Sequence, residues 1–119
     1  MDLHEIGWVA GFLEGEGSFM ASTGQNAHIT VYACQVQREP LDRLVKFTGG
    51  GRVTGPRVRK TPANRQPIHE WTVTRRAAYD LMRLLYPYMS PVRQSQISKA
   101  TAIYDARITS QGQFKHGSR

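Results

Sequence analysis

Apolar residues recur with helical spacing near the start of the chain. Residues 6–19 read IGWVAGFLEGEGSF, and one side of the predicted helix carries Ile6, Val9, Phe12 and Leu13. A second stripe is formed by three glycines at four-residue intervals, Gly7, Gly11 and Gly15, and Ala10 extends it. We expect the helix to end near Gly15, because the sequence EGEG disfavours helix.

The glycine stripe is unfavourable unless another backbone packs against it. A glycine inside a helix costs roughly 0.5–1 kcal/mol relative to alanine. We therefore predict a surface that pairs with a second helix and brings acidic side chains to a shared point. The residues predicted to form it are Gly7, Ala10, Gly11 and Glu14. The alternative is a helix whose glycines serve packing only, followed by two solvated acids, Glu14 and Glu16.

The remaining pattern predicts an α+β domain in the order αββαββα, followed by a final helix or a tail. Strands are expected over residues 17–23, 28–37, 52–59 and 68–74. Pro40 suits the first turn of a second helix, which stops at the glycines of residues 49–51. Residues 1–108 are predicted to form a single domain, and residues 109–119 a flexible tail.

Two more helices follow the last predicted strand. Thr74 is expected to cap the first of them, and Ser90 and Pro91 begin the second. The predicted apolar stripe of the first is Ala77, Leu81, Leu84 and Leu85. The residues predicted to face inward from the second are Ile97, Ala100, Tyr104 and Ile108.

Alternation assigns the side chains of two strands to opposite faces of the sheet. One face of residues 28–37 carries Ile29, Val31, Ala33, Gln35 and Gln37. Both faces of this strand are apolar at its start, so the strand alone does not identify the buried one. In residues 68–74, Trp71 shares a face with His69 and Val73, and we expect Trp71 in the core.

Length and cysteine content limit the class of protein. A chain of 119 residues suits one domain, small enough for dimerisation to bury additional surface. The single cysteine, Cys34, excludes an internal disulfide framework and fits a reducing compartment. No apolar run reaches the length of a membrane span, and the N-terminus carries acids rather than a basic leader. We expect a soluble intracellular protein, in a compartment that the sequence does not identify.

Charge is distributed unevenly along the chain. The net charge is +7, yet residues 1–37 contain no Lys or Arg. The segment from Arg52 to Arg76 holds seven basic residues and a single acid, Glu70. Such a block favours phosphate binding through counterion release, and a solubilising charged face is the alternative. The histidines lack the spacing of a zinc site, and Walker, nucleophile-elbow and Rossmann motifs are absent, which disfavours zinc, ATP-driven and acyl-transfer chemistry.

Two segments resemble a known family. VAGFLEGEG, residues 9–17, with Ser18 and Phe19 after it, resembles the nine-residue signature of the LAGLIDADG homing endonucleases. LLYPYMSPVRQSQI, residues 84–97, is also similar to the family, so the resemblance spans most of the chain. It implies an antiparallel four-stranded saddle-shaped sheet with helices packed on one face, plus a C-terminal helix. Only one copy of the signature is present, and single-copy members of the family act as homodimers.

The resemblance also implies a reaction centre shared by two chains. Each signature helix of the family brings an acid to the metals; here that acid is Glu16, where the family more often has aspartate. Because hard cations prefer oxygen ligands, Glu16 and the Gly15 carbonyl are the predicted ligands of Mg²⁺ or Mn²⁺. Arg93 is expected to stabilise charge in the transition state, and Gln37 to orient water. The alternative for both is a solvated polar side chain.

Sequence recognition is predicted to come from polar side chains of strands that face the major groove, where Arg pairs with guanine and Gln with adenine. The resemblance favours the side of Gln35 and Gln37 toward DNA. The predicted DNA-binding residues are Ser22, Gln25, Gln35, Arg38, Arg52, Arg57, Arg59, Lys60, Arg65 and His69. For the basic residues of the long loop, contact with phosphate alone is the alternative.

These patterns and the resemblance together predict a homodimeric, magnesium-dependent endonuclease of double-stranded DNA. Two identical chains imply a palindromic or near-palindromic target. The family further implies cleavage that leaves short 3′ overhangs, and an intron-encoded origin. The main alternative is a catalytically inactive nucleic-acid-binding protein of the same fold, either an RNA splicing cofactor or a DNA-binding regulator. A third possibility is a basic RNA-binding or ribosome-associated monomer.

Overall fold

The structure of the protein is a computed structural model that describes residues 1–23, 28–58 and 66–117, with side chains as far as residue 108. Its elements are α1 (Leu3–Glu16), β1 (Gly17–Ala21), β2 (Ile29–Gln35), α2 (Glu39–Thr48), β3 (Arg52–Arg57), β4 (Ile68–Thr74), α3 (Arg75–Leu85), a short 3₁₀ helix η1 (Tyr86–Tyr88) and α4 (Pro91–Gly117). This sequence of elements confirms the predicted order αββαββα with a further C-terminal helix. None of the helices in these ranges combines the length and apolar character of a membrane span.

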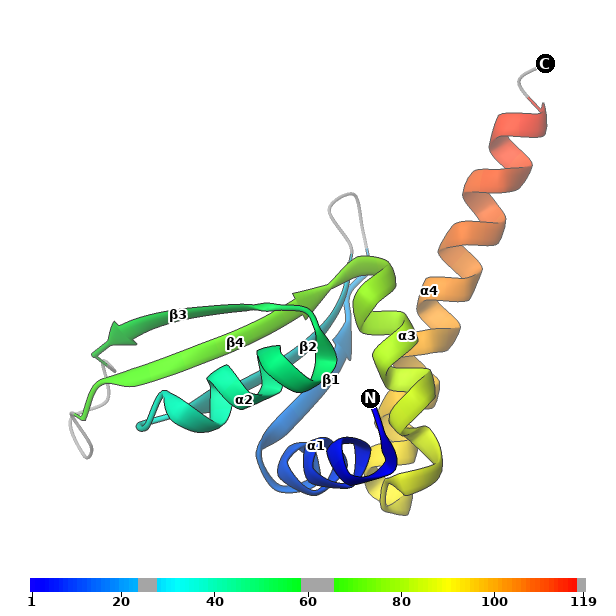
Figure 1. The fold of residues 1–119 in the computed structure, drawn as a ribbon. Helices are drawn as coiled ribbons and strands as arrows, with labels where there is room; N and C mark the ends of the chain where they lie inside the picture. Colours follow the sequence, from blue (N-terminus) through cyan, green and yellow to red (C-terminus); the bar gives the residue numbers. More distant parts are fainter. Residues whose placement is uncertain (24–27, 59–65, 118–119) are drawn as a thin grey trace.

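The strands form one antiparallel sheet in the order β1-β2-β4-β3. Figure 1 shows α1 and α2 on one side of this sheet, and α3 and α4 beyond the end where β4 passes into α3. The other side of the strands is not covered by any of these helices (Figure 1). We call this uncovered side the open face.

Strand alternation places the core between the sheet and the helices. The buried side chains of the sheet on this side are Phe19, Ile29, Val31, Ala33, Trp71 and Val73. Those of α1 and α2 that meet them are Val9, Leu13, Leu41 and Leu44. Fully burying a large apolar side chain contributes about 1.5–3 kcal/mol, so this layer provides much of the driving force for folding.

Trp71 lies in this layer, as predicted, with no exposed surface. Its indole Nε1 donates a hydrogen bond to the Gly50 carbonyl at 3.2 Å. The neighbouring Gly51 has a φ of 91°, and a Cβ on it would lie 2.3 Å from Trp71 Nε1. Both the positive φ and the close approach require glycine at this position. The turn that ends α2 is therefore shaped around the indole.

The buried face of α3 differs from the prediction. Leu81 and Leu85 are buried as expected, but Ala77 is exposed and Leu84 is 44% exposed. The other buried residues of α3 are Ala78, Tyr79 and Met82. The helix presents Tyr79 inward because its ring stacks on Tyr104 of α4, with centroids 4.5 Å apart, and its hydroxyl donates to Asp105 at 2.8 Å.

Helix α4 is longer than predicted. Ile97 and Ala100 face the core as expected and Tyr104 packs against it, whereas Ile108 is 48% exposed. The helix continues to Gly117, through residues 109–117 of the segment predicted to be a tail. Figure 1 shows its C-terminal part extending away from the rest of the molecule. The flexibility predicted for residues 109–119 stays a prediction.

Candidate active site and nucleic-acid interface

The glycine stripe of α1 lies on the surface of the single chain. Asp2 and Glu5 form a capping box that begins the helix, and the opposite side of the helix enters the core. Gly7, Gly11 and Gly15 are all exposed, and a Cβ on any of them would meet no atom within 4 Å. The packing of this chain therefore gives no reason for glycine at these three positions.

Two other residues predicted for the same surface have contacts within the chain. Ala10 is only 5% exposed and belongs to the core, because it lies four residues after Ile6 and three before Leu13 on the inward side of α1. Its assignment to the glycine stripe is wrong. Glu14 is half-buried and binds Ser90, the residue before α4. The exposed stripe thus consists of the three glycines, with Leu3 (78% exposed) at its beginning.

The acidic end of α1 is open to solvent. Glu16 is the last residue of the helix and is exposed, and Gly17, which begins β1, donates its N–H to the Leu13 carbonyl. The carboxylate of Glu16 and the carbonyl oxygens of the last helical turn are hard oxygen donors, the kind that Mg²⁺ and Mn²⁺ accept. Within the described part of this single chain, no three His, Cys, Asp or Glu side chains are grouped closely enough to hold a metal ion.

Arg93 lies against this end of α1. Its Nε donates to the Glu14 carbonyl at 3.0 Å and its Nη1 to Gln96 Oε1 at 2.9 Å, and its guanidinium lies 5.9 Å from the centre of the Phe19 ring. A cavity of about 390 Å³ adjoins it, between residues 18–21 of β1 and the side of α4 that carries Lys99. Arg93 is therefore a cation held beside Glu14 by hydrogen bonds. Gln37 is exposed in the turn after β2, and its role stays a prediction.

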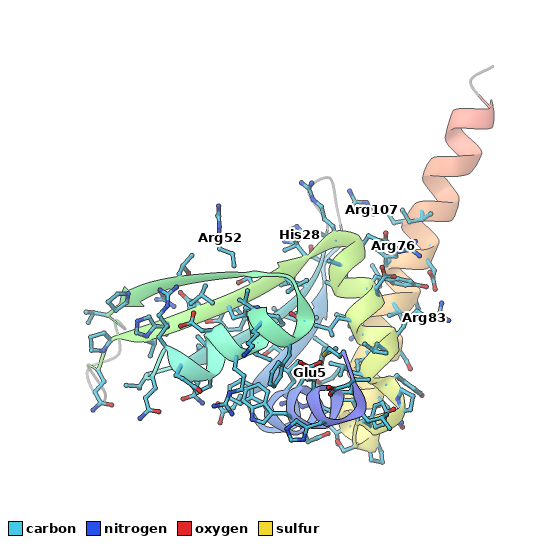
Figure 2. All side chains as sticks on the ribbon, in the orientation of Figure 1. Glu5, His28, Arg52, Arg76, Arg83 and Arg107 are labelled. Carbon is cyan, nitrogen blue, oxygen red and sulfur yellow. The ribbon has the colours of Figure 1, made fainter. Side chains whose placement is uncertain are left out.

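Most side chains on the open face are polar. Register pairs place on this side Ser18, Met20, Thr30, Tyr32, Cys34, Arg52, Thr54, Glu70, Thr72 and Thr74, of which Met20 is an exposed apolar residue. Figure 2 shows Arg52 projecting from β3 away from α1 and α2. A hollow of about 540 Å³ is lined there by Arg52, Thr54, Thr72 and Thr74, among others. This composition suits contact with the hydrogen-bonding edges and phosphates of a nucleic acid.

Gln35 and His69 do not belong to the open face. They are register partners, and alternation places them on the side of Ala33 and Trp71, which the helices cover. His69 Nδ1 also lies 3.1 Å from the Val36 carbonyl. The expectation that the side of Gln35 faces DNA is therefore wrong, because the apolar residues of β2 that precede it on this side are buried in the core.

The other predicted DNA-binding residues have different positions. Ser22 accepts a hydrogen bond from the His28 N–H at 3.3 Å, and Arg38 pairs with Asp42 at 3.1 Å at the start of α2. Arg57 is bonded to Glu70 on the open face. Gln25, Arg59, Lys60 and Arg65 lie outside the described residues.

Sequence reasoning missed three residues that organise these sites. Ser90 was expected only to cap α4, yet it also holds Glu14, and this contact between residues far apart in the chain has no sequence signal. Tyr32 donates one hydrogen bond to Glu70 across the open face. The signal for Glu70 was present, since it is the only acid of the basic segment.

Comparison with known proteins finds likeness in structure only. No family model and no curated protein matches the chain. The group I intron-encoded homing endonuclease I-CeuI, complexed with DNA, matches with a TM-score of 0.70 at 16% identity, over 94% of this chain and 59% of that chain. The homing endonuclease I-CvuI, in complex with its target in the presence of 2 mM Ca, matches with a TM-score of 0.63 at 19% identity, over 86% and 68%.

A third match carries the family's name. The LAGLIDADG meganuclease I-AabMI, bound to uncleaved DNA, has a TM-score of 0.65 at 12% identity, over 94% of this chain and 40% of that chain. The chain thus spans less than two thirds of I-CeuI and of I-AabMI. The protein has the fold of the LAGLIDADG homing endonucleases, the family that its first helix resembles in sequence.

Proposed function

We propose that the protein is a homodimeric, divalent-metal-dependent endonuclease that cleaves double-stranded DNA at a palindromic or near-palindromic site and leaves 3′ overhangs. The observation that carries the proposal is the exposed glycine stripe of α1, which leads directly to the exposed carboxylate of Glu16. The proposal is further supported by the polar and basic open face and by the DNA bound to I-CeuI and I-CvuI.

The stripe suits pairing with a second copy of the same helix. Because no side chain projects from Gly7, Gly11 or Gly15, two backbones can approach closely along this line. A two-fold axis between the paired helices brings the two copies of Glu16 to the same end, so each chain contributes one acid to a shared centre. Symmetry then requires each half of the DNA target to meet an identical surface.

The residues at this end of α1 fit a divalent cation. Glu16 and the Gly15 carbonyl would hold it, as two oxygen donors from each chain. Mg²⁺ or Mn²⁺ bound there would lower the pKa of a water molecule and neutralise charge at the phosphate. Arg93, fixed by the Glu14 carbonyl and Gln96, contributes a further positive charge to the phosphate undergoing cleavage. Gln37 would orient the attacking water.

Selection of a DNA target followed by cleavage tests this function. The native chain selects binding sites from randomised double-stranded DNA without divalent metal, and the selected sites are then incubated with Mg²⁺. We expect cleavage of both strands by the native chain and none by Glu16→Gln, which keeps the shape of the side chain and removes its charge. Binding of the selected site is expected for both proteins.

The same experiment separates the endonuclease from the inactive binding protein. Site-specific binding without cleavage of any selected site by the native chain would reject the enzyme and favour a DNA-binding regulator. Preferential selection of RNA from a mixed pool would favour the splicing cofactor instead.

A further inference from the structure

Three side chains from three strands form one hydrogen-bonded group on the open face. Arg57 at the end of β3 donates from Nε to Glu70 Oε1 at 2.8 Å and from Nη2 to Glu70 Oε2 at 3.1 Å. The hydroxyl of Tyr32, on β2, donates to the same Oε2 at 2.5 Å. Glu70, on β4, therefore lies at the centre of the group and binds the strands on either side of its own.

The three members differ in how far they reach toward solvent. The side chain of Arg57 is 55% exposed, whereas that of Glu70 is only 19% exposed. The donors around Glu70 hold its pKa below the usual value, with the hydrogen bond from Arg57 as the largest cause, and burial with the bond to Glu70 raises the pKa of Tyr32. At neutral pH the Glu70 carboxylate is thus ionised and the Tyr32 phenol is protonated. The Arg57 side chain is the more exposed partner of the ion pair.

The pairing with Glu70 leaves one edge of the guanidinium unused by the carboxylate. Both bonds to Glu70 use Nε and Nη2, so Nη1 and the outer N–H of Nη2 lie along the other edge. The Tyr32 hydroxyl also interacts with the guanidinium. That edge offers two parallel donors, which match the O6 and N7 acceptors that guanine presents in the major groove. A carboxylate already holds this guanidinium in one plane. The side chain therefore loses little additional conformational entropy when it pairs with guanine.

Resting on the DNA binding of the proposed function, we propose that Arg57 reads one guanine in each half of the target, and that Glu70 and Tyr32 are positioning residues that fix its guanidinium for this contact. Glu70 itself is too enclosed to accept from cytosine, and its oxygens already accept three hydrogen bonds. Simple phosphate binding accounts poorly for the group, because the carboxylate offsets the positive charge that would attract a phosphate.

Position-resolved selection of DNA by binding, without divalent metal, tests the assignment. The native chain is expected to select guanine at one position of each half-site. Arg57→Gln removes this preference, by about 5- to 150-fold as expected for a bidentate contact. Glu70→Gln and Tyr32→Phe weaken the preference at the same position and at no other. The matched control is Asp80→Asn, which breaks a similar pair with Arg76 on α3 (2.9 Å) and leaves every position unchanged.

Several results would overturn the assignment. An unchanged guanine preference in Arg57→Gln or Glu70→Gln rejects it, and so does a uniform loss of affinity at all positions together with a lower melting temperature, which indicates a purely structural cross-link. A native chain that selects no DNA sequence rejects it as well. Because cleavage is not measured, a protein that selects guanine through Arg57 but does not cut DNA disproves the endonuclease while it supports this inference.

Discussion

The carboxylate of Glu14 accepts two hydrogen bonds from Ser90, one from the backbone N–H at 2.8 Å and one from the hydroxyl at 2.7 Å. Glu14 belongs to the signature helix and Ser90 is the residue immediately before α4, so this contact joins the candidate active site to the start of the last helix. The Ser90 hydroxyl also accepts from the Arg93 N–H at 3.4 Å, as a residue that caps a helix does. Ser90 therefore contacts both the Glu14 carboxylate and the backbone N–H of Arg93.

Because of this contact, the stability of the protein is expected to depend on pH. The two bonds from Ser90 hold the pKa of Glu14 below its ordinary value of 4.5, with the backbone N–H as the largest cause. A carboxyl whose pKa is lowered by folding adds stability above its unfolded pKa, and this is lost as pH falls through the folded pKa. Glu14→Gln is thus expected to lower the melting temperature near neutral pH and to have a smaller effect below pH 4.5. Thermal unfolding followed by circular dichroism measures the melting temperatures of the native and Glu14→Gln proteins at neutral and at acidic pH. An equal effect of the substitution at the two pH values would count against the contact.

Replacing a glycine of the stripe by alanine is expected to stabilise the single chain and to destabilise the dimer. Gly11→Ala meets no atom within 4 Å in the single chain, so it is expected to stabilise that chain by about 0.5–1 kcal/mol. In the dimer the added methyl separates the paired helices, and we expect a shift to monomer in sedimentation equilibrium. Ser95→Ala, at an exposed position of α4, is the control and should leave the mass unchanged. A Gly11→Ala protein that remains fully dimeric contradicts the pairing.

Gly51 provides a test of the core. Gly51→Ala forces a side chain onto a φ of 91° and against the Trp71 indole, so we expect a loss of about 1–3 kcal/mol in the free energy of unfolding. The control is Gly50→Ala, whose Cβ meets no atom within 4 Å, and which should change stability by less than about 1 kcal/mol. Urea denaturation compares the two, and equal stabilities would contradict the described packing of this turn.

Arg93 is expected to affect the rate of cleavage more than binding. Arg93→Gln removes a positive charge that the Glu14 carbonyl and Gln96 hold in place, and a loss of about 10²-fold in the cleavage rate is expected. Affinity for the selected site should change only slightly. Arg83→Gln, on α3, removes an arginine bound to Tyr79 and serves as the control. A parallel loss of affinity and rate would instead make Arg93 an ordinary DNA contact.

Local patterns predicted the fold well because they act within single elements. The periodicity of residues 6–19, Pro40 and the glycines after Thr48 locate α1 and α2, and alternation around Trp71 assigns the faces of β4. The inward face of α3 was wrong at Ala77 and Leu84, since Tyr79 packs on a helix that comes later in the chain. The spacing of apolar residues within one helix does not reveal which later helix packs against it.

The site residues that lie within the signature helix could largely be placed from the sequence, whereas those that depend on contacts between distant elements could not. Gly7, Gly11 and Glu16 lie on the surface of one helix, where spacing is enough to place them. Ala10 was assigned to the wrong side of that helix, and Gln35 to the wrong face of the sheet. The role of Glu14 depends on Ser90, and that of Arg57 on Glu70, and each pair comes together only through the tertiary fold.

Mixed dimers show whether two chains share one reaction centre. Native chain and Glu16→Gln chain are unfolded together in equal amounts, refolded, and assayed for cleavage of the selected site with Mg²⁺. If cleavage needs the carboxylate of both chains, only native dimers are active, and the rate should fall to about one quarter of that of the native protein. A rate of about one half would mean that each chain acts alone, and would rule out a shared reaction centre.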